Sequence, residues 1–272
     1  MLLDHFQIPS HEGADAAQSA SPARHRIPFF RFHGLSGETR VSHAVFTRIG
    51  GTSAPPFASL NTSYSTGDHP ENVTRNLRII AAALDAEVLL YMKQVHGTAV
   101  HVVSGGDAPE PQGGITADAM ITDRPRAALM VKQADCQGVI LYDPEKRILG
   151  LVHCGWRGNT LGILGTAVER MKKEFGCRVA VIRAAIGPSL GPCCAEFVAH
   201  EEIFPAPFRR FMVSENHFDL WGVSRWQLAE AGVREDNIET AGICTRCRAD
   251  LFFSYRAEGT TGRFATVAML RP

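Results

Sequence analysis

The sequence predicts an α+β fold in a single domain. Short β-rich runs outnumber amphipathic helical segments, neighbouring runs resemble hairpins, and few strand–helix–strand units are present. This mixture is typical of α+β proteins and not of a doubly wound parallel sheet. The chain has 272 residues, 45% of them hydrophobic, and no clear polar linker divides it. That is enough apolar material for one large core. We expect the domain to span residues 28–272.

Residues 1–27 come before the predicted strands, are rich in Ala, Ser, His and Pro, and show no periodicity. They are expected to form a flexible extension outside the domain.

The strands are predicted from short runs rich in β-branched and aromatic residues, bounded by turn residues. The predicted strands are 40–47, 88–92, 98–103, 118–122, 126–132, 138–142, 147–153, 178–186, 238–243, 250–255 and 263–270.

Two helices are predicted from apolar residues at helical spacing. The first covers 70–85 and starts at Pro70, a favourable first-turn residue. The second covers 159–175, with Asn159 as its cap and Gly176 as its stop. Shorter helices are expected near 195–203 and 219–231.

Composition favours a small-molecule partner in a cytoplasmic protein. The 28 basic and 28 acidic residues balance, which gives no electrostatic footprint for nucleic acid or an anionic membrane. No apolar run approaches the ~18 residues of a membrane span, and the first residues lack the pattern of a secretory signal. Seven cysteines, an odd number, are expected to be reduced thiols or metal ligands and not disulfides.

Cys136 and His153 lie at the two ends of a predicted hairpin, CQGVILYDPEKRILGLVH. A turn at Asp143–Lys146 places Tyr142 opposite Arg147 and Cys136 opposite His153. Directly opposed residues project from one face, with Cβ atoms roughly 5 Å apart. The hairpin is otherwise apolar on both faces, so polar residues at its end need a functional reason. The pair could share a zinc ion or act as nucleophile and base.

A second histidine, His96 in KQVHG, could complete a zinc site. Catalytic zinc commonly takes three protein ligands and leaves one position for water, and His96, Cys136 and His153 would provide that set. Arg157 in GWRGN lies near the predicted start of the 159–175 helix, where free N–H groups attract anions. Arg157 has two interpretations: it could belong to a phosphate site close to the metal, or it could be an ordinary surface charge.

Five motifs in order, QVHG, ADC, HxGWRG, AIGPSLGPCC and LFFSYRAEGTTGR, resemble the YfiH family, also labelled polyphenol oxidase or laccase-domain proteins. The resemblance covers about residues 28–272. It implies an αββα-type sandwich with mixed sheets and a mononuclear zinc site with His96, Cys136 and His153 as ligands. The chain departs from the usual pattern at Gln133, Gly138 and Cys154.

The resemblance also implies phosphorolysis of adenosine, inosine, guanosine and methylthioadenosine, with some adenosine deamination. The expected partners are therefore purine nucleosides and phosphate. Arg157 and Arg48 are expected to contact phosphate and Asn61 the ribose, while Asp135, next to Cys136, is the candidate general acid.

The remaining cysteines do not match a known metal motif. A CxxC at Cys244 and Cys247 would have to meet the adjacent pair Cys193 and Cys194, which lacks the paired spacing of a zinc ribbon. The sequence leaves their role open and disfavours a second zinc site.

Four other functions compete with this one. A multicopper laccase needs many histidines, commonly in HxH pairs, and the 11 histidines include none, although copper could occupy a Cys/His site adventitiously. A metal-free cysteine hydrolase, for example an amidase acting on cell-wall precursors, would use Cys136 as nucleophile and His153 as base. A binding protein without catalysis is disfavoured by the concentration of reactive groups. The standard zinc deaminase signature is incomplete.

Overall fold

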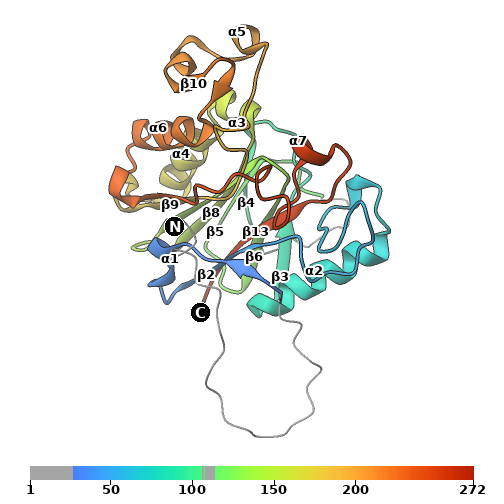
Figure 1. Ribbon diagram of the computed structural model, residues 1–272. Coiled ribbons are helices and arrows are strands. Elements are labelled where there is room, and N and C mark those ends of the chain that lie inside the picture. Colours follow the sequence, from blue (N-terminus) through green and yellow to red (C-terminus); the bar gives the residue numbers. More distant parts are fainter. Residues whose placement is uncertain (1–26, 106, 108–113) are drawn as a thin grey trace, which may run out of the picture.

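Two mixed β-sheets pack face to face, and helices cover both outer faces. The computed structural model describes residues 27–105, 107 and 114–272. Figure 1 shows α2 (Pro70–Leu84) on one side of the sheets, and α4 (Ile163–Phe175) with α6 (Leu220–Glu230) on the other. The predicted α+β class and the αββα arrangement are confirmed. The predicted extension 1–27 lies outside the described residues, apart from Ile27, which is buried.

The first sheet has five strands in the order β1-β2-β13-β6-β3. Its neighbours are antiparallel except β3 and β6, which are parallel. Its outer face packs on α2 through the apolar stripe that predicted this helix. The strands are β1 (Phe29–Phe30), β2 (Val41–Phe46), β13 (Phe264–Leu270), β6 (Ala127–Gln133) and β3 (Val88–Tyr91).

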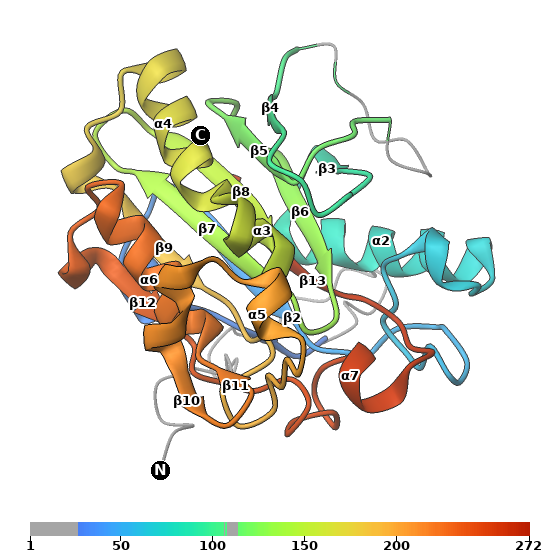
Figure 2. The same ribbon diagram turned by 90° about the horizontal axis from the view of Figure 1, so that it is seen from above.

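The second sheet has six strands in the order β12-β9-β7-β8-β5-β4. Its two edge pairs are parallel and its central pairs are antiparallel. Figure 2 shows α4 lying over β7 and β8. The strands are β12 (Ile238–Thr240), β9 (Arg183–Ile186), β7 (Gln137–Asp143), β8 (Ile148–Cys154), β5 (Ala119–Thr122) and β4 (Val100–Val102).

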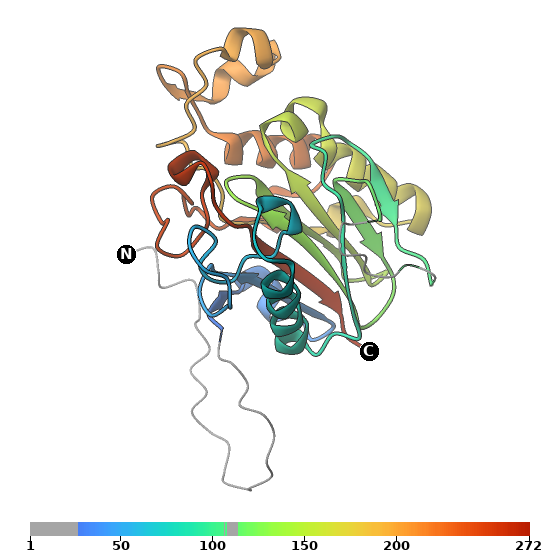
Figure 3. The same cartoon turned by 90° about the vertical axis from the view of Figure 1, so that its right-hand side faces the viewer.

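An excursion after β9 projects from the sandwich, as Figures 1 and 3 show for the orange segment. It carries α5 (His200–Ile203) and the two-stranded sheet of β10 (Met212–Ser214) and β11 (His217–Phe218), packed around an aromatic cluster. The other helices are α1 (His33–Ser36), α3 (Trp156–Leu161), α7 (Tyr255–Glu258) and the 3₁₀ turns Tyr64–Thr66, Val179–Val181, Ala206–Phe211 and Glu235–Asn237. No helix among these residues is long and apolar enough to cross a membrane.

The core between the sheets comes from alternate residues of both inner faces. Leu129 and Ala268 of the first sheet meet Ile140 and Leu151 of the second. Burial of several such side chains, each contributing about 1.5–3 kcal/mol, stabilises the sandwich. Both faces of β7 and β8 are buried, because α4 covers the outer face. Their apolar runs are explained by this double coverage.

The predicted hairpin register was wrong. Gly138, not Cys136, lies opposite His153 in the β7–β8 pair. The Asp143 side chain accepts hydrogen bonds from the backbone N–H groups of Glu145 and Lys146, so Asp143 ends the strand and the turn moves one residue along. Arg147 supplies the left-handed residue, with φ 57°. Opposite pairs move by two positions, which keeps Cys136 and His153 on the same face.

Four further predictions need correction. The predicted strand 178–186 contains the 3₁₀ turn Val179–Val181, so only Arg183–Ile186 is a strand. The 159–175 helix is two helices, since α3 begins at Trp156 and Gly162, with φ 75°, separates it from α4. The run 250–255 forms turns and the start of α7, not a strand, although Phe252 and Phe253 are buried. The predicted helix 195–203 is reduced to α5. An apolar run identifies burial but not whether the backbone is extended.

Candidate functional site

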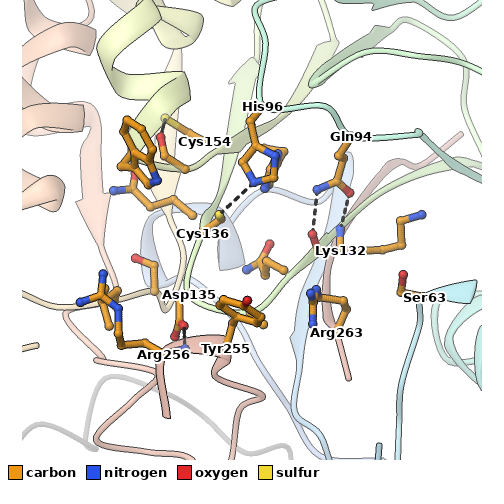
Figure 4. A pocket seen from close by; sticks show the side chains of 18 of the residues that line it. Ser63, Gln94, His96, Lys132, Asp135, Cys136, Cys154, Tyr255, Arg256 and Arg263 are labelled. Atoms are coloured by element: carbon orange, nitrogen blue, oxygen red, sulfur yellow. Dashed lines mark hydrogen bonds between the residues drawn. The ribbon is translucent and has the colours of Figure 1, made fainter. Parts of the chain in front are cut away.

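A cavity of about 1210 Å³ lies at one end of the sandwich, where strands of both sheets end. It is lined by residues that follow β3 and β8, by the short β6–β7 connection, and by residues before β13. Because this connection joins the two sheets, the cavity is built from both. Its size suits a small organic ligand. Figure 4 shows side chains from these segments pointing into the cavity.

His96, Cys136 and His153 meet in this cavity. One ligand atom from each lies within 4.8 Å of the others, and the Cys136 Sγ is 3.8 Å from the His96 Nε2 (Figure 4). The two imidazole rings meet edge to face, with centroids 4.8 Å apart. His153 is buried, Cys136 is half-buried and His96 is exposed. These three residues are the ligand set predicted from the sequence, and the fold brings them together.

Asp118 holds both histidines in place. Its fully buried carboxylate accepts a hydrogen bond of 2.9 Å from His153 Nδ1 and others from the backbone N–H groups of His96 and Gly97, at 2.9 and 2.7 Å. His96 takes a left-handed conformation with φ 59°, and the bonded N–H groups stabilise this turn. Since Nδ1 of His153 is bound to Asp118, its Nε2 is the nitrogen left to act as a metal ligand.

The electrostatics of this group favour an ionised thiol. Burial opposes ionisation of Cys136, but the neighbouring His153 and His96 outweigh burial and lower the thiol's pKa. Burial would also lower the pKa of His153, yet the Cys136 charge and the Asp118 hydrogen bond raise it. Burial opposes ionisation of Asp118 as well, but its hydrogen bonds from His153 and Gly97 hold its pKa below the usual range.

Two glycines leave space for side chains in and beside this group. A Cβ on Gly155 would lie 2.7 Å from the Cys136 Sγ and 3.3 Å from the His96 ring. A Cβ on Gly138, opposite His153, would lie 2.5 Å from the Gln133 side chain. Gln133 and Gly138, two of the positions where the chain departs from the usual family pattern, are therefore matched to each other in space. Cys154 points to the outer core, and burial raises its pKa.

Asp135 lines the cavity but has three donors of its own. Its carboxylate accepts from the Thr245 and Ser254 hydroxyls, both at 2.7 Å, and from the Arg256 backbone N–H at 2.6 Å. With φ 84°, Asp135 forms the turn that presents Cys136. These contacts tie the β6–β7 connection to the loop that holds Thr245 and to the start of α7.

The charged lining of the cavity is strongly cationic. Among the described residues that line the cavity, Asp135 is the only acidic one. Burial lowers the pKa of Lys132 to about 8, and its ammonium lies 4.9 Å from the Tyr91 ring centroid. Arg263 is held by the carbonyl oxygens of Thr261 and Gly262. The basic lining residues are Lys93, Lys132, Arg256 and Arg263.

Three predicted substrate contacts lie outside the cavity lining. The Arg48 guanidinium bonds Ala58 O, Ala249 O and Glu258, and Asn61 is fully buried in the loop before Tyr64. Arg157 is exposed on α3 and is not a lining residue. Arg48 and Asn61 thus brace loops, and Asn61 Oδ1 accepts from the Arg263 N–H at 2.9 Å. None of the three lines this cavity, and their contacts with phosphate and ribose stay predictions.

Sequence reasoning assigned no role to Asp118, Lys132 or Arg263. Asp118 begins the predicted strand 118–122, and Arg263 ends LFFSYRAEGTTGR, a motif used only for the family resemblance. A buried polar residue at the start of a predicted apolar strand was the available signal for Asp118. Lys132 gave a similar signal, a cation at the end of an otherwise apolar run.

Comparison with known proteins gives a consistent picture. Residues 42–271 match the family described as multi-copper polyphenol oxidoreductase laccase. A relative from Bacteroides thetaiotaomicron, named purine nucleoside phosphorylase, is 33% identical over 260 residues, covering 88% of this chain and 95% of the relative. One from Deinococcus radiodurans with the same name is 37% identical over 252 residues, covering 89% and 92%.

Solved structures show the same fold. The crystal structure of the hypothetical protein YfiH from Bacillus licheniformis has a TM-score of 0.82 at 32% identity, covering 89% of this chain and 96% of that one. YlmD from Geobacillus stearothermophilus also has a TM-score of 0.82, at 29% identity, with 99% and 100% covered.

Proposed function

The chain belongs to the multi-copper polyphenol oxidoreductase laccase family, which includes YfiH, and we propose that it is a zinc-dependent purine nucleoside phosphorylase. The observation that carries the proposal is a group of two imidazoles and one thiolate on the wall of a cation-lined cavity. The names of its relatives support the reaction class. The substrates are purine nucleosides and phosphate.

His96, Cys136 and His153 would hold the zinc ion. Two nitrogen ligands and one thiolate suit zinc, and three protein ligands leave a position open for a small molecule. The lowered pKa of Cys136 fits this task because a ligand thiol must be deprotonated. Asp118 supplies the carboxylate partner that orients a zinc-bound histidine. When bound, zinc acts as a Lewis acid that stabilises developing negative charge.

The remaining lining residues bind and orient the two substrates. In phosphorolysis a phosphate oxygen bonds to the ribose C1′, while the bond from C1′ to the purine nitrogen breaks and the base leaves with the electron pair. Arg263 and Lys132 attract the phosphate through their charge, and holding both substrates in one cavity removes the entropic cost of their encounter. Tyr255, which is 61% exposed and lines the cavity, offers an aromatic face to the purine. Asp135 positions Cys136.

The test is phosphate-dependent cleavage of inosine by the zinc-loaded protein. We expect hypoxanthine and ribose 1-phosphate in equal amounts, and no hypoxanthine when phosphate is omitted. A Cys136→Ala variant is the negative control, and Cys177→Ala, which changes a buried cysteine outside the cavity lining, is the matched positive control. Cleavage that proceeds at the same rate without phosphate would contradict phosphorolysis.

A metal-free cysteine hydrolase is the second candidate, because the lowered pKa of Cys136 and the raised pKa of His153 also describe a nucleophile with its base. Alkylation separates the two. A zinc-bound thiolate reacts slowly and becomes reactive after chelation, whereas an activated nucleophile reacts fast without metal. Rapid alkylation of Cys136 in chelator-treated protein that had kept full activity would establish the hydrolase.

Copper oxidase chemistry and deamination are less well supported. Groups of three or more metal-ligating side chains occur twice in the described ranges: this group, with two histidines, and a cluster of four cysteines, with none. Multicopper oxidation needs several histidine-rich sites. Adenosine deamination remains a prediction, tested by inosine formation from adenosine in the absence of phosphate.

A further inference from the structure

Four cysteines from two separate loops meet beside the second sheet. Cys193 and Cys194 lie in the loop after β9, and Cys244 and Cys247 in the loop after β12. Their four sulfur atoms lie within 4.8 Å of one another. The Cys247 sulfur is 3.6 Å from the sulfurs of both Cys193 and Cys194. None of the four lines the cavity.

The parallel pairing of β9 and β12 produces this convergence. Both strands end on the same side, and the pairing continues into the loops as a bridge between Ser189 and Cys244. The backbone N–H of Thr245 donates to Ser189 O at 3.0 Å. Gly191 allows close approach, since a Cβ there would lie 3.0 Å from the Cys244 Cβ and 2.8 Å from the Trp221 ring. The loops are therefore held in register before any ligand binds.

The sulfur geometry suits a tetrahedral metal ion better than a disulfide. Zinc–sulfur bonds of about 2.3 Å place the four sulfurs of a tetrahedron roughly 3.8 Å apart, whereas a disulfide needs about 2.05 Å. All four thiols are free. The Cys244 sulfur also accepts hydrogen bonds from the backbone N–H groups of Gly191 and Cys247, which stabilise a thiolate.

We propose that Cys193, Cys194, Cys244 and Cys247 bind one structural zinc ion, independent of the cavity site. Four thiolates complete a tetrahedron and leave no position for substrate, which is the pattern of a structural site. Cys193 and Cys247 are exposed, so the ion can enter from solvent. The ion would fix one wall of the cavity, because Thr245, between Cys244 and Cys247, donates to Asp135.

Metal analysis of reduced protein, purified without oxygen, tests this site. We expect two zinc ions per chain in the wild type, one in Cys247→Ser and one in Cys136→Ala. After exchange with Co²⁺, the intense absorption of a tetrahedral thiolate complex should persist in Cys136→Ala and disappear in Cys247→Ser. Cys177→Ser, which also removes one thiol, should keep both ions and the full spectrum.

Thiol protection in the wild type gives an independent measurement should Cys247→Ser not fold. Mass spectrometry after brief alkylation should find Cys193 and Cys247 protected in zinc-loaded protein and modified after chelation. Equal modification with and without zinc would overturn the proposal, and so would a Co²⁺ spectrum unchanged by Cys247→Ser. A zinc content of one that falls to zero in Cys136→Ala would do the same. Because these measurements follow metal and thiols and not nucleoside cleavage, their outcome is separate from that of the proposed phosphorylase activity.

Discussion

The two groups of metal-ligating side chains differ in their donors and in what surrounds them. The His96, Cys136 and His153 group has three mixed donors, opens into a cavity and is oriented by a buried carboxylate. The cluster of Cys193, Cys194, Cys244 and Cys247 has four sulfur donors, lies outside that cavity lining and is held by backbone pairing between loops. An incomplete set of ligands beside a cavity suits catalysis, and a complete set between loops suits stability.

The largest expected effect comes from exchanging one thiol in each group. Cys136→Ala should lower kcat/KM for inosine phosphorolysis by about three orders of magnitude, because loss of the ligand removes several kcal/mol of electrostatic stabilisation. Its thermal midpoint should fall less than that of Cys247→Ser, because a site with three protein ligands links fewer parts of the chain than a site with four. Cys247→Ser should keep most of the activity at low temperature, while its midpoint falls by roughly 10 °C if zinc binding contributes about 4 kcal/mol.

Steady-state kinetics and calorimetry on the two variants, with zinc content measured for each, check this opposition. If Cys247→Ser lost activity as completely as Cys136→Ala while remaining folded and zinc-loaded at the cavity site, the division into a catalytic and a structural group would be wrong.

A smaller effect is expected from the carboxylate that distinguishes the two groups. Asp118→Asn keeps the size of the side chain but removes the charge that orients His153, and its amide N–H₂ would face backbone donors. Zinc affinity at the cavity site should fall about 10- to 100-fold. Competition with a chelator of known affinity measures it. Asp107→Asn, in the His101–Asp107 pair away from the cavity, is the matched control and should leave zinc affinity unchanged.

The sequence could predict the elements with strong periodicity and the ligands at their ends. The helix at 70–85 and the strands leading to Cys136 and His153 were predicted because burial imposes their apolar patterns. The turn at Asp143 could not be placed, since a side-chain hydrogen bond decided which residue ended the strand. That error moved opposite pairs by two positions, so the prediction of a shared face survived.

Convergence across the fold was harder to predict than local structure. Spacing rules compare neighbours along the chain, whereas the four cysteines meet because β9 and β12 are parallel neighbours. Arg48 and Asn61 show a different limit of sequence patterns. Both lie in stretches that resemble the family, but their polar atoms are bonded to backbone and side chains of the loops around them. A motif indicates that a residue matters, but it does not say whether the residue contacts substrate.

A charge that lines the cavity should matter more than one that does not. Arg263→Gln should raise the KM for phosphate about tenfold, since a charged hydrogen bond contributes about 1.5 kcal/mol net. Arg157→Gln, the same exchange at an exposed position outside the lining, should leave this KM nearly unchanged. Initial rates at varied phosphate and saturating inosine measure both. A larger effect in Arg157→Gln would favour the predicted phosphate contact at Arg157.

The smallest expected effect is a pH dependence of the KM for phosphate, with no matching change in the metal content of the cysteine cluster. Burial lowers the pKa of Lys132 to about 8, so its ammonium is charged below that pH and neutral above it. The KM for phosphate should therefore rise between pH 7 and pH 9, by roughly fivefold if the charge contributes about 1 kcal/mol.

In Lys132→Arg the charge persists throughout this range, so the rise should disappear. Lys93→Arg, a second lining lysine, should keep the wild-type profile. The metal content of the cysteine cluster should stay constant across the same range, because four thiolates already bound to zinc release no further protons there. A rise in KM that survives in Lys132→Arg would assign the titration to another group and remove Lys132 from the phosphate site.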